Sequence, residues 1–294
     1  RRRRRPSLMS TLRQVGIITL VAVVGFFGLR ALPDTQCTFL HADHQPVVVG
    51  GLEFCGLNEE ANFYSPKALR FPVELKVALD AAGTAGELRL LKDDGHPYYS
   101  HEVAVSHTQR IHLHLRQSGG ERAYAHVHPQ PAADGSWRFE VPARLRGVGL
   151  RAYVDFSDVR TSRTMMAEAE VAPAFTTAAP PSAPVPRNRI VELTASTTQT
   201  GSSAMIRLKL AGPAGKTLRL KPIMGSLGHA VVFSVDRPDA GYAHMHPTLE
   251  GGEYADNPTL AFRLRLPPPG TYDFWLNLND GQDELLRATL VVTP

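Results

Sequence analysis

The chain carries few cysteines and none of the short motifs that mark common enzymes. Only two of its 294 residues are cysteine, and no stretch matches a serine-hydrolase elbow, a zinc-protease helix or a phosphate-binding loop. Residues 147–152, GVGLRA, fit a loose dinucleotide-binding pattern, but the sequence after them does not favour a helix. These absences exclude the enzyme classes that the motifs mark, and we expect a protein without enzymatic activity.

A basic surplus is also lacking outside the first residues. Six arginines and no acid precede residue 15, and without them 26 Lys+Arg stand against 28 Asp+Glu, a net charge of about −2. The net charge of +4 and the pI of 9.2 therefore reflect the N-terminus. We expect no nucleic acid partner, because the bulk of the chain has no excess of positive charge.

A long apolar run occurs only at residues 15–29, fifteen uncharged residues between Arg13 and Arg30. As a helix the run covers ~22 Å of a ~30 Å hydrocarbon core, and snorkelling of the two arginines would lengthen it. A cleaved signal peptide is the alternative, but no convincing cleavage site follows. We therefore expect residues 1–32 to be a cytoplasmic basic tail and a single-pass anchor in a bacterial inner membrane, with the bulk of the chain periplasmic.

The two cysteines, Cys37 and Cys55, lie eighteen residues apart in a connector that we assign to residues 33–66. In an oxidising compartment the simplest prediction is a disulfide between them. Such a bond would stabilise by ~3 kcal/mol in the chain-entropy model. A metal site that adds His41 and His44 is the alternative, but its spacing matches no zinc or haem pattern.

Beyond the connector the sequence predicts strands and no helix. Residues 71–80, FPVELKVALD, alternate apolar with polar side chains, as a half-buried strand does. About seven short strands precede residue 171, and a similar set follows residue 189 after an uncharged, proline-rich linker at 172–188. We expect an all-β fold: two tandem immunoglobulin-like antiparallel β-sandwiches, residues 67–171 and 189–294, after a single N-terminal transmembrane helix.

One hexapeptide occurs twice, as YAHVHP at 124–129 and YAHMHP at 242–247, 118 residues apart. The match extends to residues 111–129 and 228–247, with one residue fewer in the first copy, and resumes further along the chain. The two halves therefore indicate an internal duplication with a period near 117 residues. In this alignment the histidines correspond in pairs: His112 with His229, His126 with His244, and His128 with His246.

Each repeat supplies histidines that could bind a metal. Residues two apart on a strand share a face, so the two histidines of each hexapeptide point together, and a third begins the strand before. Three imidazoles suit Zn²⁺ or Cu²⁺ at bonds of ~2.0–2.1 Å, and a thioether favours Cu(I). Met224 is five residues before His229, whereas Met245 faces away from its neighbours. The alternative is a structural role, with the ring nitrogens bonded to backbone.

The second repeat also resembles a known family. It reads MGSLGHAVV at 224–232, AHMHP at 243–247 and PPPGTYDFW at 267–275. This is similar to a small β-sandwich domain of bacterial envelope proteins, associated with copper and heavy-metal handling, whose pattern is M-G-x-x-G-H-x-V-V, H-x-H-P and P-x-x-G-x-Y-x-x-W. The resemblance covers residues 189–294 and implies four metal ligands: Met224, His229, His244 and His246.

The first repeat departs from that pattern. It shows no counterpart of Met224, although it has the additional histidines His107 and His114. Its own ligand candidates, His112, His126 and His128, are the weaker set. We expect His96 and His101 to be exposed and outside any site.

Two functions remain open from the sequence. The first is a membrane-anchored periplasmic accessory or scaffold subunit, which the sequence favours. Gly16, Gly25 and Gly28 permit close packing of the predicted span against transmembrane subunits of a larger complex. The alternative is a periplasmic copper-binding or copper-delivery protein, with copper as the cofactor and zinc as the other candidate.

Overall fold

The computed structural model describes residues 8–30, 47–49, 52–54, 60–120, 122–173, 185–213, 216–237, 240–250 and 256–294. The chain divides into two compact units, Arg1–Leu40 and His41–Pro294. The predicted disulfide between Cys37 and Cys55 lies outside the described residues.

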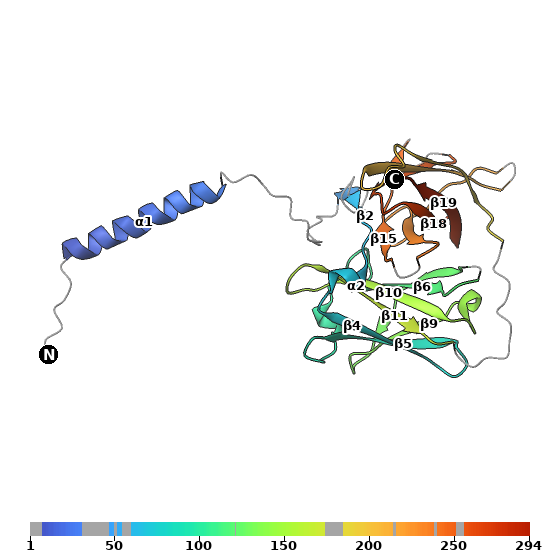
Figure 1. Cartoon of the computed structure of the whole chain (residues 1–294), viewed down its shortest axis with the longest axis horizontal. Helices are drawn as coiled ribbons and strands as arrows, with labels where there is room; N and C mark the ends of the chain where they lie inside the picture. Colours follow the sequence, from blue (N-terminus) through green and yellow to red (C-terminus); the bar gives the residue numbers. More distant parts are fainter. Residues whose placement is uncertain are drawn as a thin grey trace. The chain divides into compact units, whose positions relative to one another are not determined.

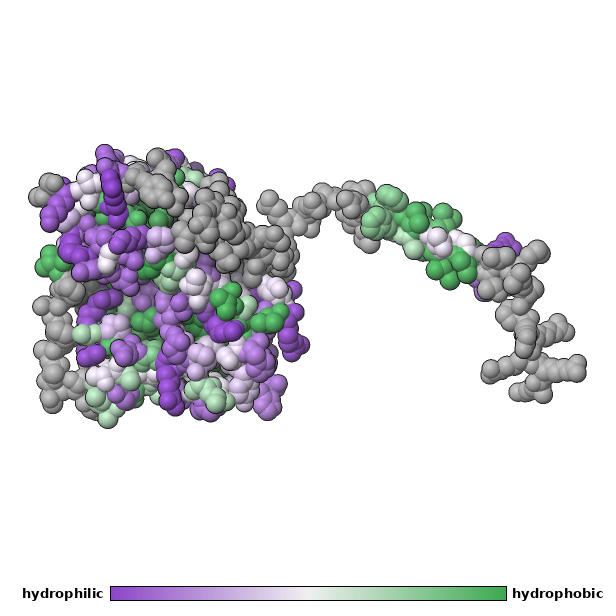
Figure 2. Space-filling model, turned by 180° about the vertical axis from the view of Figure 1, so that it is seen from behind, coloured by the Kyte–Doolittle hydropathy of each residue, from purple (hydrophilic) through white to green (hydrophobic). Residues whose placement is uncertain are grey.

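The first unit contains one helix, α1 (Leu8–Arg30), of 23 residues. Its apolar side chains between Val15 and Phe27 are exposed, and Figure 2 shows most of this stretch as hydrophobic surface. Within the described ranges, no helix has both the length and the apolar character needed to cross a membrane. The predicted membrane span is therefore not confirmed.

The second unit begins with the described part of the connector. Strands β1 (Val47–Val49) and β2 (Leu52–Phe54) pair with each other in antiparallel fashion. Strand β3 (Glu60–Ala61) runs parallel to β17 (Thr259–Arg265), far along the chain. The one-turn helix α2 (Pro66–Leu69) then leads into the first sandwich.

The first sandwich consists of two four-stranded antiparallel sheets. One has the order β4 (Val73–Leu79), β5 (Ala85–Lys92), β9 (Trp137–Glu140), β8 (Gln130–Pro131). The other has the order β11 (Thr164–Val171), β10 (Leu150–Ser157), β6 (Ile111–Gln117), β7 (Tyr124–Val127). Two short 3₁₀ turns, η1 (Ser100–Glu102) and η2 (Ala143–Leu145), lie in the loops.

The second sandwich, coloured from yellow to red in Figure 1, repeats this order strand for strand. One sheet is β12 (Arg189–Ala195), β13 (Ser203–Ala211), β17, β16 (Thr248–Glu250). The other is β15 (Tyr242–Met245), β14 (His229–Ser234), β18 (Gly270–Asn279), β19 (Asp283–Val292). The all-β prediction is confirmed. Within the described residues the first sandwich has eight strands, and the second has the corresponding eight together with β3, which makes its β17 sheet five-stranded. About seven were predicted for each, and β8 and β16 are only two and three residues long.

Strand β6 is buried on both of its faces. Ile111, Leu113 and Leu115 enter the core of the first sandwich. The alternate residues His112, His114 and Arg116 point to the opposite face, as the two-residue period of a strand requires, and are buried as well. A sheet of this kind has a second protein layer against its outer face.

That second layer is the corresponding sheet of the second sandwich. In β14, Ala230 and Val232 enter the second core, and the alternate side chains, including Phe233, are buried outside it. Tyr124 packs 5.5 Å from Phe233, and Tyr153 packs 5.2 Å from Tyr242, between ring centroids. The sheets containing β6 and β14 therefore lie face to face, which brings the two repeats together.

A tight backbone contact fixes the start of the second hexapeptide. Tyr64 and Tyr242 exchange two backbone hydrogen bonds of 2.9 Å. Gly241 makes this approach possible, since a Cβ there would lie 1.9 Å from the carbonyl oxygen of Tyr64 and the φ of Gly241 is +106°. The connector is thus bound to the strand that carries His244.

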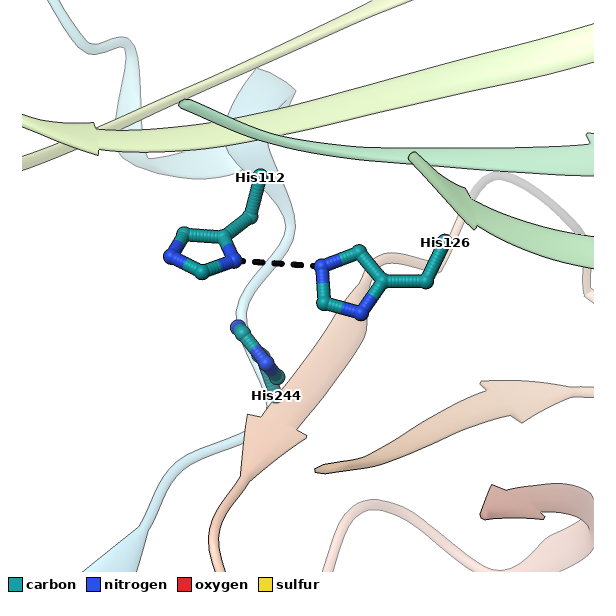
Figure 3. A group of neighbouring side chains, drawn as sticks. All are labelled: His112, His126 and His244. Carbon is teal, nitrogen blue, oxygen red and sulfur yellow. Dashed lines mark hydrogen bonds between the residues drawn. The ribbon is translucent and has the colours of Figure 1, made fainter. Parts of the chain in front are cut away.

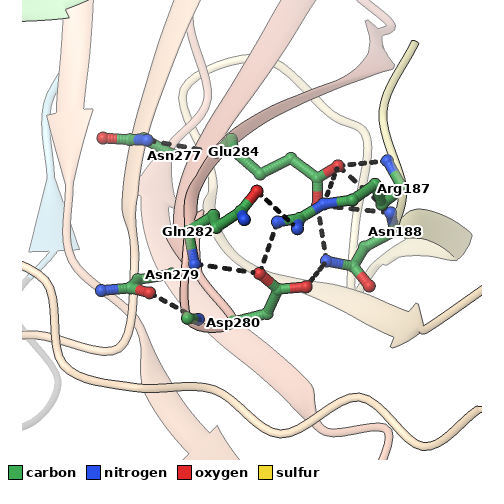
Figure 4. Close-up of polar contacts among 8 residues, drawn as sticks. Arg187, Asn188, Asn277, Asn279, Asp280, Gln282 and Glu284 are labelled. Carbon is green, nitrogen blue, oxygen red and sulfur yellow. Dashed lines mark hydrogen bonds and ion pairs between the residues drawn. The ribbon is translucent and has the colours of Figure 1, made fainter.

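The end of the linker is fixed by a polar network on the β18–β19 hairpin (Figure 4). Arg187 donates to Asp280 at 2.6 Å, and the buried Asn188 side chain donates to Asp280 at 2.8 Å and to Glu284. The second sandwich therefore begins at these two residues.

Candidate metal centre

Each sandwich forms the same pair of facing imidazoles. In the first, Nδ1 of His112 on β6 lies 3.1 Å from Nε2 of His126 on β7. In the second, Nδ1 of His229 on β14 lies 3.4 Å from Nε2 of His244 on β15. The duplication seen in the sequence is therefore also a duplication of side-chain geometry.

A backbone carbonyl orients the first imidazole of each pair. Nε2 of His112 lies 3.3 Å from the carbonyl oxygen of Ser106, and Nε2 of His229 lies 3.1 Å from that of Ile223. When Nε2–H donates to the carbonyl, Nδ1 keeps its lone pair and faces the partner imidazole. Metal-binding histidines are commonly oriented by this kind of second hydrogen bond.

The turns that provide these carbonyls are also equivalent. Residues 106–109 and 223–226 each form a two-residue turn closed by backbone bonds of 2.7 and 3.0 Å. The first central residue has a φ of 52° at His107 and 50° at Met224. The structure thus corrects the sequence alignment, which found no counterpart of Met224: the counterpart is His107. Both residues lie five positions before the first histidine of their repeat, and the change of residue type hid the match.

The four imidazoles approach one another across the boundary between the sandwiches. Ring centroids of His112 and His244 are 5.1 Å apart, and those of His126 and His244 are 5.3 Å apart. His229 lies 5.7 Å from His126 and 6.3 Å from His112. Figure 3 shows His112, His126 and His244 arranged around one space, and ligand atoms of these three lie within 4.8 Å of one another.

Further histidines surround these four. Ligand atoms within 4.8 Å of one another also occur in a second set of three: His229, His244 and His246. His107 of the first sandwich packs 3.9 Å from His246 of the second, between ring centroids. His128, the counterpart of His246, lies 4.6 Å from His126. We call the eight residues the histidine cluster: His107, His112, His114, His126, His128, His229, His244 and His246.

One carboxylate, Asp155 on β10, joins the histidine cluster from the first sandwich. It accepts hydrogen bonds from Nε2 of His114 at 2.9 Å and from the hydroxyl of Tyr242 at 3.0 Å. Nδ1 of His244 lies 3.4 Å from its other oxygen. The remaining nitrogen of His114 lies 2.8 Å from the hydroxyl of Tyr124. Asp155, His114 and His244 form a third set of potential ligands.

Burial keeps most of these imidazoles neutral. Burial above all, together with neighbouring imidazoles, lowers the pKa well below its ordinary value in four of them: His112, His126, His229 and His246. Burial lowers the pKa of His128 to about 4. Burial raises the pKa of the Asp155 carboxyl, but interaction with His244 and the hydrogen bond from His114 outweigh it and hold that pKa well below its usual range. Neutral imidazoles beside a carboxylate are ready to bind a cation without first losing protons.

Three nitrogens of the histidine cluster are buried without a hydrogen-bond partner in the described part of the chain. They are Nδ1 of His126, Nε2 of His128 and Nε2 of His246. A buried polar atom left unpaired costs ~1–3 kcal/mol. Three of them in one cluster show that its hydrogen bonding is incomplete, which is unusual for histidines with a purely structural role.

The predicted histidine ligands of both repeats thus lie in one place rather than in two separate sites. The sequence pattern did not indicate an acid beside them, but Asp155 faces His114 and His244. The available signal was weak: Asp155 lies directly opposite His112 in the β10–β6 register.

The structure also shows where the other histidines and methionines named from the sequence lie. His96 and His101 are exposed, as expected. Met245 lies in the core of the second sandwich, on the side of β15 opposite to His244. Met224 is half-buried in its turn, and its role as a ligand stays a prediction.

Comparison with protein families gives one match. A model described as "Domain of unknown function (DUF8832)" matches residues 186–293, which is the second sandwich. No curated protein matches the chain.

Three solved structures are similar at low levels. A tetra-tandem repeat from the extending region of a large adhesion protein is 12% identical, over 74% of this chain and 48% of that one, with a TM-score of 0.22. Invasin, a bacterial integrin-binding protein, is 12% identical over 74% and 39%, with a TM-score of 0.21. A chimeric titin Z1Z2 is 15% identical over 81% and 100%, with a TM-score of 0.19. The chain spans about half or less of the first two, and these scores carry no functional argument.

Proposed function

We propose that this protein binds a transition-metal ion, copper or zinc, in the histidine cluster between its two sandwiches. One observation carries the proposal: imidazoles from both repeats converge in a buried space in which three ring nitrogens have no hydrogen-bond partner among the described residues. Imidazole nitrogen is a good ligand for zinc and copper and a poor one for magnesium or calcium. The family resemblance of the second repeat supports the same class of ion.

The hydrogen bonds around the histidine cluster support this proposal. A structural explanation for buried histidines requires that their ring nitrogens be paired with backbone or side chains. Both nitrogens of His112 and of His229 are paired in this way, each with a carbonyl oxygen and another imidazole. Three other ring nitrogens of the histidine cluster are buried with no partner among the described residues. Since a neutral imidazole has one N–H and one lone pair, each pair can form a single hydrogen bond, and further nitrogens stay unpaired.

The test is a titration of the full-length protein with Zn²⁺ and Cu²⁺, after treatment with a chelator, in competition with a chromophoric chelator of known affinity. His244→Ala is the informative variant, because His244 belongs to all three sets of potential ligands. The double variant His96→Ala, His101→Ala is the matched control, since it removes two exposed histidines. Binding that is lost in His244→Ala and kept in the control supports the proposal. No binding by the unaltered protein, or equal binding by all three, contradicts it.

The accessory-subunit function that the sequence favours, with its membrane anchor and partner subunits, stays a prediction. A metal ion between two sandwiches is compatible with it, because an ion can stabilise a scaffold as well as be carried. The absence of enzymatic activity likewise stays a prediction.

A further inference from the structure

Four imidazoles of the histidine cluster surround one point. His112 and His126 come from the first sandwich, and His229 and His244 come from the second. Their ring centroids are 5.3 and 5.6 Å apart within the sandwiches, and 5.1, 5.3, 5.7 and 6.3 Å apart between them. These six separations describe a distorted tetrahedron of rings. Ligand atoms that all lie within 4.8 Å of one another come from His112, His126 and His244, and His229 is the outlying member.

The size of this tetrahedron fits one ion. With metal–nitrogen bonds of ~2.0–2.1 Å, tetrahedral ligand atoms are roughly 3.3 Å apart and the imidazole centroids roughly 5.2 Å apart. The two nitrogen pairs, at 3.1 and 3.4 Å, already have the first separation. The His112–His229 pair, at 6.3 Å, is the longest edge, so binding would draw these two rings together by about 1 Å.

In three of the rings, the contact made by one nitrogen determines that the other nitrogen faces the ion. Carbonyl oxygens hold Nε2 of His112 and of His229, which leaves Nδ1 of each directed inward. Asp155 lies beside Nδ1 of His244, which leaves Nε2 directed inward. Three of the four rings are therefore oriented for one common ligand, by partners from both sandwiches.

We infer that this site binds a single tetrahedral divalent ion of the Zn²⁺ type, shared by His112, His126, His229 and His244, and that the ion ties the two sandwiches together. This inference rests on the proposed function and adds the number of ions, their class and the need for both repeats. One ion is favoured over two, because His244 belongs to every potential ligand set and has one inward nitrogen. Zinc is favoured over copper, because four nitrogens in a tetrahedron suit Zn²⁺, whereas Cu²⁺ prefers square-planar sites and Cu⁺ prefers sulfur.

Co²⁺ is the probe for this inference, because a tetrahedral Co²⁺ site absorbs visible light far more strongly than an octahedral one. Full-length protein, freed of metal, is titrated with Co²⁺ and then with Zn²⁺, and the bound metal is counted by elemental analysis. We expect one ion per chain, an intense visible band, and loss of that band when Zn²⁺ displaces Co²⁺. Two ions per chain, or a weak octahedral spectrum, would overturn the inference.

Two variants test whether both repeats are needed. His112→Ala and His229→Ala remove equivalent ligands from opposite sandwiches. Each should weaken binding of the single ion by at least ~100-fold, and neither should leave a second, tightly bound ion. If instead each variant keeps one tightly bound ion out of two, each sandwich has its own site and the inference fails, although the proposed metal binding stands. If the unaltered protein binds neither Co²⁺ nor Zn²⁺, the proposed function itself fails. Should a variant not fold, as judged by circular dichroism, the stoichiometry and spectrum of the unaltered protein still decide.

Discussion

Asp155 of the first sandwich lies 3.4 Å from Nδ1 of His244 in the second, so a carboxylate of one repeat orients a histidine of the other. The same carboxylate accepts the hydroxyl of Tyr242 at 3.0 Å. Within the second sandwich itself, the position equivalent to Asp155 is Asn277, opposite His229. The two repeats therefore differ where they orient their histidines, and the second depends on the first.

Replacing this carboxylate should weaken metal binding. In Asp155→Asn the side chain keeps its size but loses its charge, so His244 is less firmly held with Nε2 directed inward. We expect the affinity for Zn²⁺ to fall ~10–100-fold, as it does when such partners are removed elsewhere. Competition titration of the full-length protein measures this. Asp256→Asn, at an exposed aspartate of the second sandwich, is the control, and equal affinities in the two variants would contradict the role of Asp155.

The sequence predicted the strands and the duplication because both have local signals. Alternating side chains mark strands such as 73–79, and the repeated hexapeptide aligns the two halves. It also identified three histidines in each repeat. These are properties of short segments, which do not depend on how the segments pack.

The joining of the two histidine sets could not be predicted in the same way. His112, His114 and Arg116 alternate with core residues on β6, a pattern that normally indicates a solvent-exposed face. Only the packing of β6 against the second sandwich shows that the polar face is buried. Asp155 was missed for the same reason, since its partners His244 and Tyr242 are about ninety residues further along the chain.

The metal-free protein should become less stable as the pH falls. A histidine whose pKa is lowered by folding binds a proton more readily when the chain is unfolded. Its contribution to the free energy of unfolding is therefore fully present above the unfolded-state pKa of about 6.5 and is lost as the pH falls. For His128, with a folded pKa of about 4, the loss between pH 7.5 and 5 is about 2 kcal/mol. Urea unfolding at the two pH values, with chelator present, measures it.

The matched variants separate this histidine from others. His128→Gln should reduce the difference between the two pH values, whereas His96→Gln, at an exposed position, should leave it unchanged. An identical urea midpoint at pH 7.5 and pH 5 in the unaltered protein would show that burial does not lower these pKa values.

The contact between the connector and the second hexapeptide can be tested through Gly241. In Gly241→Ala the new Cβ would lie 1.9 Å from the carbonyl oxygen of Tyr64, so the connector must move away. Gly201→Ala is the control, because Gly201 also has a positive φ, +72°, but nothing lies within 4 Å of its Cβ position. We expect the control to lose about 1–2 kcal/mol of unfolding free energy, from backbone conformation alone. Gly241→Ala should lose clearly more, about 3 kcal/mol or above. Equal losses would mean that the contact with Tyr64 does not stabilise the fold.

The linker end offers a prediction about stability that is independent of metal. Asn188→Ala removes a buried side chain that donates to Asp280 at 2.8 Å and to Glu284. Leaving these carboxylates without that donor should lower the free energy of unfolding by about 2 kcal/mol. Arg207→Ala breaks an exposed ion pair with Glu250 and should cost below ~1 kcal/mol. Urea unfolding compares the two variants. A larger loss in Arg207→Ala would contradict the prediction that the buried Asn188 contacts stabilise the fold more than the exposed ion pair.

The most direct test of the central claim is anomalous diffraction at the zinc absorption edge, from crystals of the full-length protein grown with Zn²⁺. Our account predicts one strong peak within bonding distance of His112, His126, His229 and His244, with ligands from both sandwiches. A zinc-loaded crystal whose anomalous peaks all lie away from the histidine cluster would contradict it.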